Sequence, residues 1–290
     1  MHWQSEKDYS ISHLQKSFDT NIANMYKLYL YYLSFLQEMW HFGSTQDAAQ
    51  RSKTIGENAS DFQLKLFRSP LLSELFNSNE LNKELEKYTI GWTSEEERDL
   101  IKKLFNELKA SERYSDFVQF FNDEEQHVDF ALHILKQNSE NNSLFEQHIE
   151  EQFSNVHDDY KLVFAMVKKT LMKVLKKEDS YLVTLVQDEE NTINFGRELI
   201  KMVVEKDAEI EPIVAAKITK WEPGQIAVTD RIILKMGIAE FKYFPSIHNT
   251  VTINEYVEIS KLYSPPKSKK FVNGLLDAAS KEFSKPSSQQ

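Results

Sequence analysis

The sequence predicts an all-α protein, and three observations support this prediction. The chain has seven glycines and seven prolines, with no proline between Pro70 and Pro212. Proline breaks helix interiors and glycine weakens them, so a long stretch nearly free of both favours helices. Apolar residues recur at intervals of three or four positions, which is the helical period. No segment shows the alternation of a half-buried strand or an Asn-Gly hairpin turn.

Composition excludes several classes of protein. The 290 residues are 41% hydrophobic and 28% charged, as in a folded globular chain. The absence of cysteine excludes disulfides, thiolate catalysis and cysteine-bound zinc. There is no signal-peptide pattern and no apolar run of about 18 residues that could span a membrane. We therefore expect a cytoplasmic protein without a membrane segment.

The charge balance limits the partners. The formal net charge is −10, and an acidic chain is repelled by phosphate at long range unless its positive charge is gathered locally. This balance favours protein partners, or nucleic acid that is bound only at a patch.

Three stretches before residue 176 carry clear helical signals. Ser94 and Glu97 have the spacing of a capping box before an apolar run. Phe164 to Leu175 carries a further apolar stripe. One long helix is predicted near the start of the chain by a stripe that comprises Leu14, Phe18, Ile22, Met25, Leu28, Tyr32, Leu36 and Met39.

Polar and turn-forming segments suggest a division of the chain. The run Asn138–Asn142 interrupts the helical pattern, and Trp221–Gly224 reads as a turn. We predict an N-terminal helical region over residues 1–155, a C-terminal helical bundle over 156–284, and a frayed tail over 285–290.

One motif raises the possibility of a metal enzyme. Glu124 and His127 have the Glu-x-x-His spacing of di-iron helical bundles, in which residues three apart share one helix face. A similar segment 65 residues later has Glu189, but Thr192 stands where the second histidine ligand is required. The two segments, Asp123–Phe130 and Asp188–Phe195, are either a duplication or two ordinary helix starts with acidic first turns.

Other catalytic patterns are missing from the sequence. There is no Gly-rich phosphate loop, no Gly-x-Ser-x-Gly and no His-Glu-x-x-His. We therefore expect a protein that is not an enzyme and needs no cofactor.

The last 70 residues carry the most specific pattern. Asp230–Phe241 is a strongly apolar helix, and Thr252 with Glu255 has capping-box spacing for the next one. A final helix opens after Lys267. Gly274 inside this helix costs about 1 kcal/mol relative to alanine, which suggests close approach by a neighbouring helix. The expected buried residues of the first and last of these helices are Ile233, Leu234, Ile238, Phe241, Phe271, Val272, Leu275, Leu276 and Ala279.

These residues resemble a known family. The run VTINEYVEISKLYSPPKSKKFVNGLLD is similar to the closing pattern of the NusB family, and the preceding DRIILKMGIAEFKYFP resembles its Asp-Arg-led apolar helix. The best-matching part covers about a quarter of the chain. More weakly, NMYKLYLYYLSFL and NDEEQHVDFALHIL resemble a longer form of NusB with an extended helical N-terminal half.

The resemblance implies a function. NusB-like proteins pair with the ribosomal protein NusE, bind boxA RNA in nascent ribosomal RNA transcripts and act within an RNA polymerase antitermination complex. It implies no enzymatic activity. Two alternatives stay open: a helical protein-interaction scaffold that has lost RNA binding, and a di-iron carboxylate protein that uses Glu124 and His127. A homodimer is also left open.

Charge in the last helices gives the resemblance local support. Six lysines lie between Lys261 and Lys285 against Asp277 and Glu282, a local charge of +4 on an acidic chain. Lysines near a helix N-terminus can hold phosphates, and an exposed aromatic ring can stack on a base. The resemblance places RNA contact in one run, with Phe271 and Ser268 included: Lys267, Ser268, Lys269, Lys270 and Phe271.

One departure affects this expectation. Family members usually begin with an arginine-rich helix that supplies RNA-binding surface, whereas the first arginine here is Arg51. Either the start of the sequence lies after that helix, or this version has lost it and binds RNA weakly.

Overall fold

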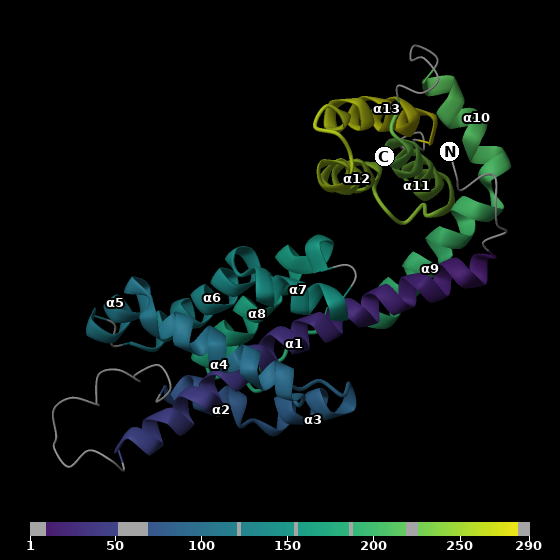
Figure 1. Cartoon of the computed structure of the whole chain (residues 1–290). Coiled ribbons are helices and arrows are strands. Elements are labelled where there is room, and N and C mark those ends of the chain that lie inside the picture. The colour runs from purple at the N-terminus through teal and green to yellow at the C-terminus, as the bar shows by residue number, and fades with distance from the viewer. Residues whose placement is uncertain are drawn as a thin grey trace. The chain divides into compact units, whose positions relative to one another are not determined.

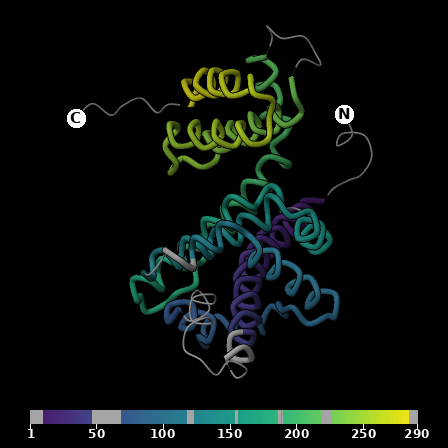
Figure 2. Tube along the Cα trace, turned by 60° about the vertical axis from the view of Figure 1, so that its left-hand side comes forward, coloured from purple at the N-terminus to yellow at the C-terminus, as the bar shows by residue number. Residues whose placement is uncertain are grey.

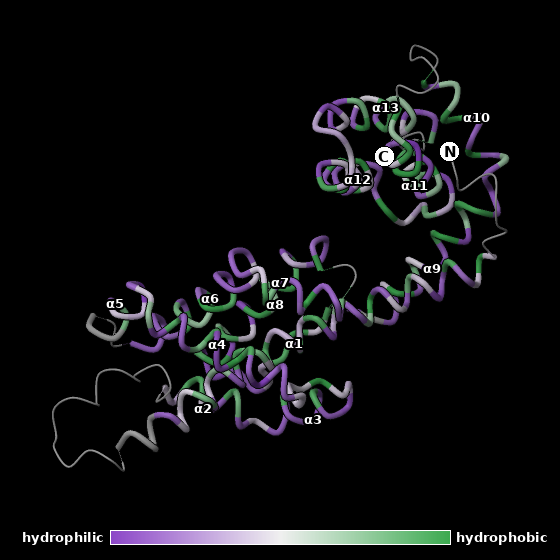
Figure 3. Tube along the Cα trace, viewed as in Figure 1, coloured by the Kyte–Doolittle hydropathy of each residue, from purple (hydrophilic) through white to green (hydrophobic). Residues whose placement is uncertain are grey.

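The computed structural model confirms an all-α chain. It describes residues 10–51, 69–120, 123–153, 156–185, 188–218 and 226–283, and every regular element within these ranges is a helix. Hydrophobic and hydrophilic residues alternate along the helices, as expected of amphipathic segments (Figure 3). None of the described helices combines the length and hydropathy that a membrane-spanning segment needs. The predicted turn at Trp221–Gly224 and the predicted tail at 285–290 lie outside the described residues.

The contacts divide the chain into two compact units. The N-terminal unit comprises residues 20–187, and the C-terminal unit comprises residues 1–19 and 188–290. This division describes which residues pack together. The predicted boundary between 155 and 156 marks where the NusB-like helical bundle begins along the sequence. The contacts do not test that boundary, and it stays a prediction.

The N-terminal unit is built around one long helix. This helix, α1 (Ile11–Arg51), begins in the C-terminal unit and continues through the N-terminal unit. Around it are α2 (Pro70–Phe76), α3 (Asn79–Lys87), α4 (Glu95–Ala110), α5 (Glu112–Phe120), α6 (Glu124–Asn141), α7 (Ser143–Gln152) and α8 (Val156–Leu175) (Figure 1).

The predicted stripe of α1 describes only part of its burial. Leu28, Tyr32, Leu36 and Met39 are buried as predicted, but every residue from 28 to 37 is buried as well. A helix that is covered on all sides is a core element rather than an amphipathic surface helix. The buried Gln37 amide finds a partner in this core, since it donates to the Phe76 carbonyl over 2.7 Å.

Local signals explain several helix starts. The Ser94–Glu97 capping box is confirmed, since the Glu97 amide donates to Ser94 Oγ and the Ser94 amide donates to the Glu97 carboxylate. Asp123 and Asp188 both act as N-caps, of α6 and of α9 (Glu189–Glu205). The similar segments at 123–130 and 188–195 therefore share the chemistry of a helix start.

The polar run at 138–142 is a shorter break than predicted. Helix α6 continues to Asn141, and Asn142 is both its C-cap and the N-cap of α7. The Asn142 side chain accepts hydrogen bonds from the amides of Leu144 and Phe145, which turns the chain within one residue.

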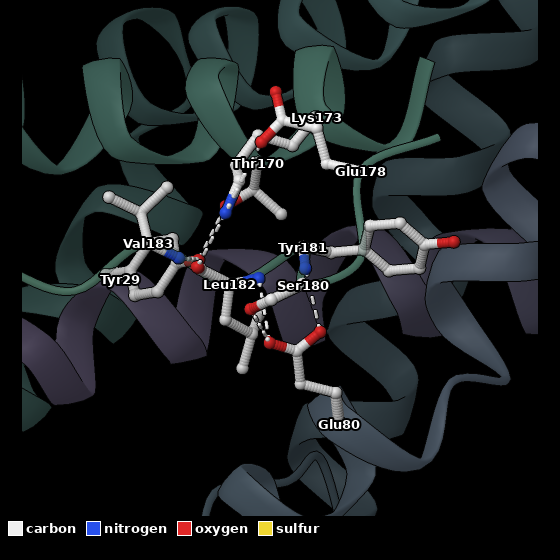
Figure 4. Close-up of polar contacts among 9 residues, drawn as sticks. All are labelled: Tyr29, Glu80, Thr170, Lys173, Glu178, Ser180, Tyr181, Leu182 and Val183. Carbon is white, nitrogen blue, oxygen red and sulfur yellow. Dashed lines mark hydrogen bonds and ion pairs between the residues drawn. The ribbon is translucent and has the colours of Figure 1, made fainter. Parts of the chain in front are cut away.

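A segment without helix follows α8 and is held by one carboxylate. Glu80, in the first turn of α3, accepts a hydrogen bond from the Ser180 hydroxyl at 2.7 Å and from the amides of Tyr181 and Leu182 at 2.8 and 3.2 Å (Figure 4). The next amide, of Val183, donates to the Tyr29 hydroxyl. These bonds satisfy backbone groups that no helix supplies.

We expect Glu80→Gln to loosen this segment. Burial raises the pKa of Glu80, but the hydrogen bonds from Ser180, Tyr181 and Leu182 lower it further and leave it below its usual value. Stability from this carboxylate is therefore present at neutral pH and is lost as the pH falls through its lowered pKa. The variant should cost about 1 to 2 kcal/mol in urea unfolding and speed hydrogen exchange at Tyr181 and Leu182.

Glu86→Gln is the matched control, since Glu86 lies exposed on the same helix. Equal exchange rates at Tyr181 and Leu182 in the Glu80 and Glu86 variants would contradict the prediction.

The C-terminal unit is a helical bundle. It contains α9, α10 (Asp207–Lys217), α11 (Val228–Tyr243), α12 (Asn249–Tyr263) and α13 (Ser268–Phe283). Helices α11, α12 and α13 all pack against one another, and Figure 2 shows them side by side in green to yellow. Its core includes the predicted Ile233, Leu234, Ile238, Phe241, Val272, Leu276 and Ala279, while Phe271 and Leu275 are half-buried at its edge.

Two sequence predictions in this bundle are wrong. Thr252 does not cap a helix, because α12 begins three residues earlier, at Asn249. The buried Thr252 hydroxyl instead donates to Glu240 over 2.6 Å. Gly274 is not a close-approach position either, since a Cβ added there would meet nothing within 4 Å.

The close approach occurs at Gly237 of α11. A Cβ at this position would lie 2.7 Å from Cδ2 of Leu276, a fully buried side chain of α13. The two helices can therefore pack at this distance only because residue 237 has no side chain.

Substitutions at Gly274 and at Gly237 should have opposite effects on the free energy of unfolding. Gly274→Ala should raise the free energy of unfolding by about 1 kcal/mol, because it adds helix propensity in open space. Gly237→Val should lower it by about 2 to 3 kcal/mol, because the new methyl groups overpack a closed core. Urea unfolding of both variants measures the difference. A stabilised Gly237 variant would show that α11 and α13 do not pack as described.

Candidate nucleic-acid interface

The five predicted RNA-contact residues lie where α13 begins, and the structure separates them into two groups. Lys267, Lys269 and Lys270 are exposed. Ser268 is buried and Phe271 is half-buried against the bundle core. The side chains of one short run thus alternate between solvent and interior, as expected at the start of a packed helix.

The exposed group, Lys267, Lys269 and Lys270, is here called the C-terminal lysine loop. Within the described residues, none of these three ammonium groups has a carboxylate within ion-pair distance. The neighbouring Lys261 and Lys281 differ, because they pair with Glu258 and Asp277. The loop therefore presents three positive charges whose neutralisation is left to solvent or to a ligand.

Ser268 ties this loop to the bundle. Its hydroxyl donates to Oδ2 of Asp230 over 2.6 Å, and its amide donates to the Pro265 carbonyl. Asp230 is itself buried in the first turn of α11, where the helix dipole favours a carboxylate. A buried hydroxyl that is committed to Asp230 positions the lysines instead of facing solvent.

A second tie lies one turn earlier. The Ser264 hydroxyl donates to the Thr229 hydroxyl over 3.2 Å, so both ends of the loop between α12 and α13 are joined to the start of α11. This arrangement reduces the freedom of the loop before any ligand binds.

The sequence-based prediction did not include an exposed aromatic ring that lies beside the loop. Tyr263, the last residue of α12, is 48% exposed, whereas the ring of Phe271 packs against the core. Tyr263 is the better placed of the two to stack on a base. The signal that could have revealed it is its position after the apolar stripe of α12 and directly before the Ser-Pro-Pro turn.

The structure gives Glu124 and His127 packing roles. Glu124 accepts a hydrogen bond from the Ser69 hydroxyl over 3.0 Å, and the buried His127 ring lies beside Phe117. Among the described residues, no group of three or more ligating side chains includes either residue. The sequence-similar Glu189 and Thr192 belong to the C-terminal unit rather than to the unit that holds Glu124.

One other ligand-like group occurs in the described residues. Glu146, Glu150 and His157 have donor atoms within 4.8 Å of one another. The group is exposed, and His157 pairs directly with Glu150 over 2.6 Å. Exposed acidic groups of this kind are common without a metal.

Comparison with known proteins assigns this all-α chain to a class of transcription factors. The NusB family model matches residues 160–281. The transcription antitermination protein NusB of Listeria monocytogenes is 32% identical over 98 residues, which cover 34% of this chain and 75% of that protein. The chain belongs to the NusB family.

Other relatives agree. NusB of Myxococcus xanthus is 36% identical over 96 residues, covering 33% of this chain and 69% of the relative. NusB of Carboxydothermus hydrogenoformans is 34% identical over 87 residues, covering 30% and 60%. No solved structure matches the chain significantly. The family is one of transcription antitermination factors that are not enzymes.

Proposed function

We propose that this protein binds boxA-like RNA in nascent ribosomal RNA transcripts together with the ribosomal protein NusE, and so acts in an RNA polymerase antitermination complex. The observation that carries the proposal is the C-terminal lysine loop. Its three exposed lysines lack carboxylate partners within the described residues and are fixed to α11 through Ser268 and Ser264.

The chemistry of this loop suits single-stranded RNA. Lysines at a helix N-terminus add their charge to the positive end of the helix dipole, which favours phosphate. The exposed Tyr263 supplies a flat surface for a base. Phosphate contacts from the lysines would position the strand, and stacking on Tyr263 would hold an unpaired nucleotide.

A protein-interaction scaffold without RNA binding is the second candidate. Exposed apolar side chains favour it: Val228 and Ile232 lie one turn apart on α11, and Leu262 lies in the last turn of α12. Exposed apolar residues are common contact points for protein partners, and NusE could occupy them within the same complex. RNA affinity therefore separates the two candidates.

Binding of a labelled boxA-type RNA, with and without NusE across a salt series, tests the proposal. Saturable binding that NusE strengthens and salt weakens is expected, because phosphate contacts release counterions. Absence of RNA binding in both cases, with NusE still bound, would favour the scaffold. Absence of both interactions would overturn the proposed function.

A further inference from the structure

Helix α8 carries a second concentration of positive charge, in the N-terminal unit. Between Tyr160 and Lys177 the sequence contains no acidic residue and six lysines: Lys161, Lys168, Lys169, Lys173, Lys176 and Lys177. On a chain of net charge −10 this is the opposite of the overall balance. The charge is therefore gathered locally, as binding to a polyanion requires.

Three of these lysines share one face of α8. At 100° per residue, Lys161, Lys168 and Lys169 fall within about a third of the helix circumference, and Lys176 follows directly after the helix ends at Leu175. All four are exposed. They are here called the α8 lysine stripe, and from Lys161 to Lys169 the helix rises about 12 Å. Between them on the same face lie Ala165 and Met172, which carry no charge.

The opposite face of α8 is used for packing. Val163, Val167, Leu171 and Val174 are buried, and α8 contacts α6 and α2. The stripe is therefore held on a rigid helix whose inner face belongs to the core of the N-terminal unit.

Within the described residues, no carboxylate lies within ion-pair distance of the four stripe lysines. Lys173, which lies off this face, differs: it pairs with Glu178 and donates to the Leu182 carbonyl. The acidic residues nearest in sequence stand at the two ends of the helix, Asp158 and Asp159 before the stripe and Glu178 and Asp179 after it. The middle of the stripe thus has no local counter-charge.

Helix stability does not account for the stripe. Cations stabilise the last turn of a helix through the dipole, which explains Lys176 and Lys177. Lys161 lies in the second turn, where a cation is not favoured by the dipole, and Lys168 and Lys169 lie in the middle. The helix dipole therefore gives no reason for lysine at these three positions.

We infer that the α8 lysine stripe is a second RNA-binding surface, which contacts the phosphate backbone without reading sequence. Lysine ammonium groups act as point charges toward phosphate and carry no base preference by themselves. The stripe would add sequence-independent affinity for the transcript to the binding at the C-terminal lysine loop. This inference rests on the proposed function, because it takes RNA as the ligand.

The test reverses the three lysines that the helix dipole does not explain: Lys161→Glu, Lys168→Glu and Lys169→Glu. The matched control, Lys83→Glu, Lys102→Glu and Lys103→Glu, makes the same change of charge at exposed positions on α3 and α4 of the same unit. Far-ultraviolet circular dichroism and thermal melting establish that both variants fold. The probe is a labelled oligouridine of about 30 nucleotides, which presents phosphates and a uniform base.

The stripe variant should bind oligouridine at least tenfold more weakly at 0.1 M salt. The slope of log affinity against log salt should fall in magnitude by about 2, because each single-strand phosphate contact contributes about 0.7. The control variant should change affinity less than twofold. Equal losses in the two variants would show that net charge alone matters and would overturn the inference.

Two further outcomes separate this inference from the proposed function. If reversal of the C-terminal lysine loop abolishes binding to both boxA-type RNA and oligouridine while the stripe variant binds both normally, the stripe is not an RNA surface and the proposed function stands. If the stripe variant keeps its RNA affinity but loses binding to polyglutamate, the stripe serves an acidic protein, which also overturns the inference.

Discussion

Reversing Lys267, Lys269 and Lys270 to glutamate is expected to weaken binding of boxA-type RNA at least a hundredfold at 0.1 M salt. Each substitution replaces an attraction to phosphate with a repulsion. A hundredfold loss corresponds to about 2.7 kcal/mol, less than 1 kcal/mol for each lysine. The expected effect is therefore modest for each residue and large in total.

The structure predicts that this loss leaves the fold intact. The three side chains are exposed, and within the described residues no carboxylate depends on them for a partner. Fluorescence anisotropy measures the affinity, and thermal melting checks the fold. The variant with Lys83, Lys102 and Lys103 reversed is again the control for net charge. RNA affinity within twofold of the unmodified protein would remove the C-terminal lysine loop from the RNA surface.

Ser268 should behave differently from the lysines beside it. Because its hydroxyl donates a hydrogen bond to the buried Asp230 carboxylate, Ser268→Ala leaves that carboxylate less satisfied. We expect a loss of about 2 kcal/mol in stability, with RNA affinity reduced only through the mobility of the loop. The sequence placed Ser268 among RNA contacts because neighbouring positions look alike until the register of α13 is known.

The positions of these helices could be predicted from the sequence because they depend on local patterns. The capping box of α4 and the apolar periodicity of α8 and α11 involve residues within one or two turns of each other. Such patterns fix the element whatever surrounds it. The burial of α1 on every side was not readable in this way, since it depends on how many other helices surround α1.

The two glycines illustrate the same limit. Gly237 and Gly274 both lie inside apolar helices, so their sequence contexts are alike. Only the packing of α11 against α13 makes Gly237 the position that cannot hold a side chain. The capping prediction for Thr252 was wrong for a related reason. Its spacing to Glu255 is that of a capping box, but its hydroxyl makes a tertiary hydrogen bond to Glu240 instead.

The α8 lysine stripe, by contrast, was available in the sequence. Eighteen residues with six lysines and no acid are visible without a structure. The structure adds that three of these lysines share a solvent face of α8 and that the opposite face is buried. An exposed basic face on a packed helix indicates a binding surface, whereas the lysine-rich run in the sequence describes only composition.

The second large effect concerns a buried lysine of the bundle. Lys235 of α11 is 1% exposed, and its ammonium group lies 2.5 Å from Asp207 Oδ1 and 2.8 Å from Glu211 Oε2, both on α10. Glu211 also pairs with Arg231. Replacing both carboxylates, Asp207→Ala with Glu211→Ala, should destabilise the C-terminal unit by about 3 kcal/mol, because a buried charge loses its partners.

The pH dependence of this network has a definite sign. Burial raises the pKa of Glu211, but hydrogen bonds from Lys235 and Arg231 lower it further, so its pKa stands below the usual value. Nearby Glu209 is held at a pKa of about 2 by Lys242, Lys206 and Tyr243. Both carboxylates stabilise the fold at neutral pH, and each contribution is lost in acid, as the pH falls through the lowered pKa of that group. The double variant, which lacks Glu211, should show a shallower loss of stability as the solution is acidified.

Removing the charge itself should restore the bundle. Adding Lys235→Met to the double variant replaces an ammonium group that has lost both carboxylates with an apolar chain of similar length among buried neighbours. Replacement of a buried ion pair by apolar residues is often neutral or stabilising, whereas loss of one side is costly. Urea unfolding should therefore rank the triple variant above the double variant. The reverse order would mean that Lys235 stabilises the bundle by packing rather than through its ion pairs, and that α10 is not held to α11 by charge.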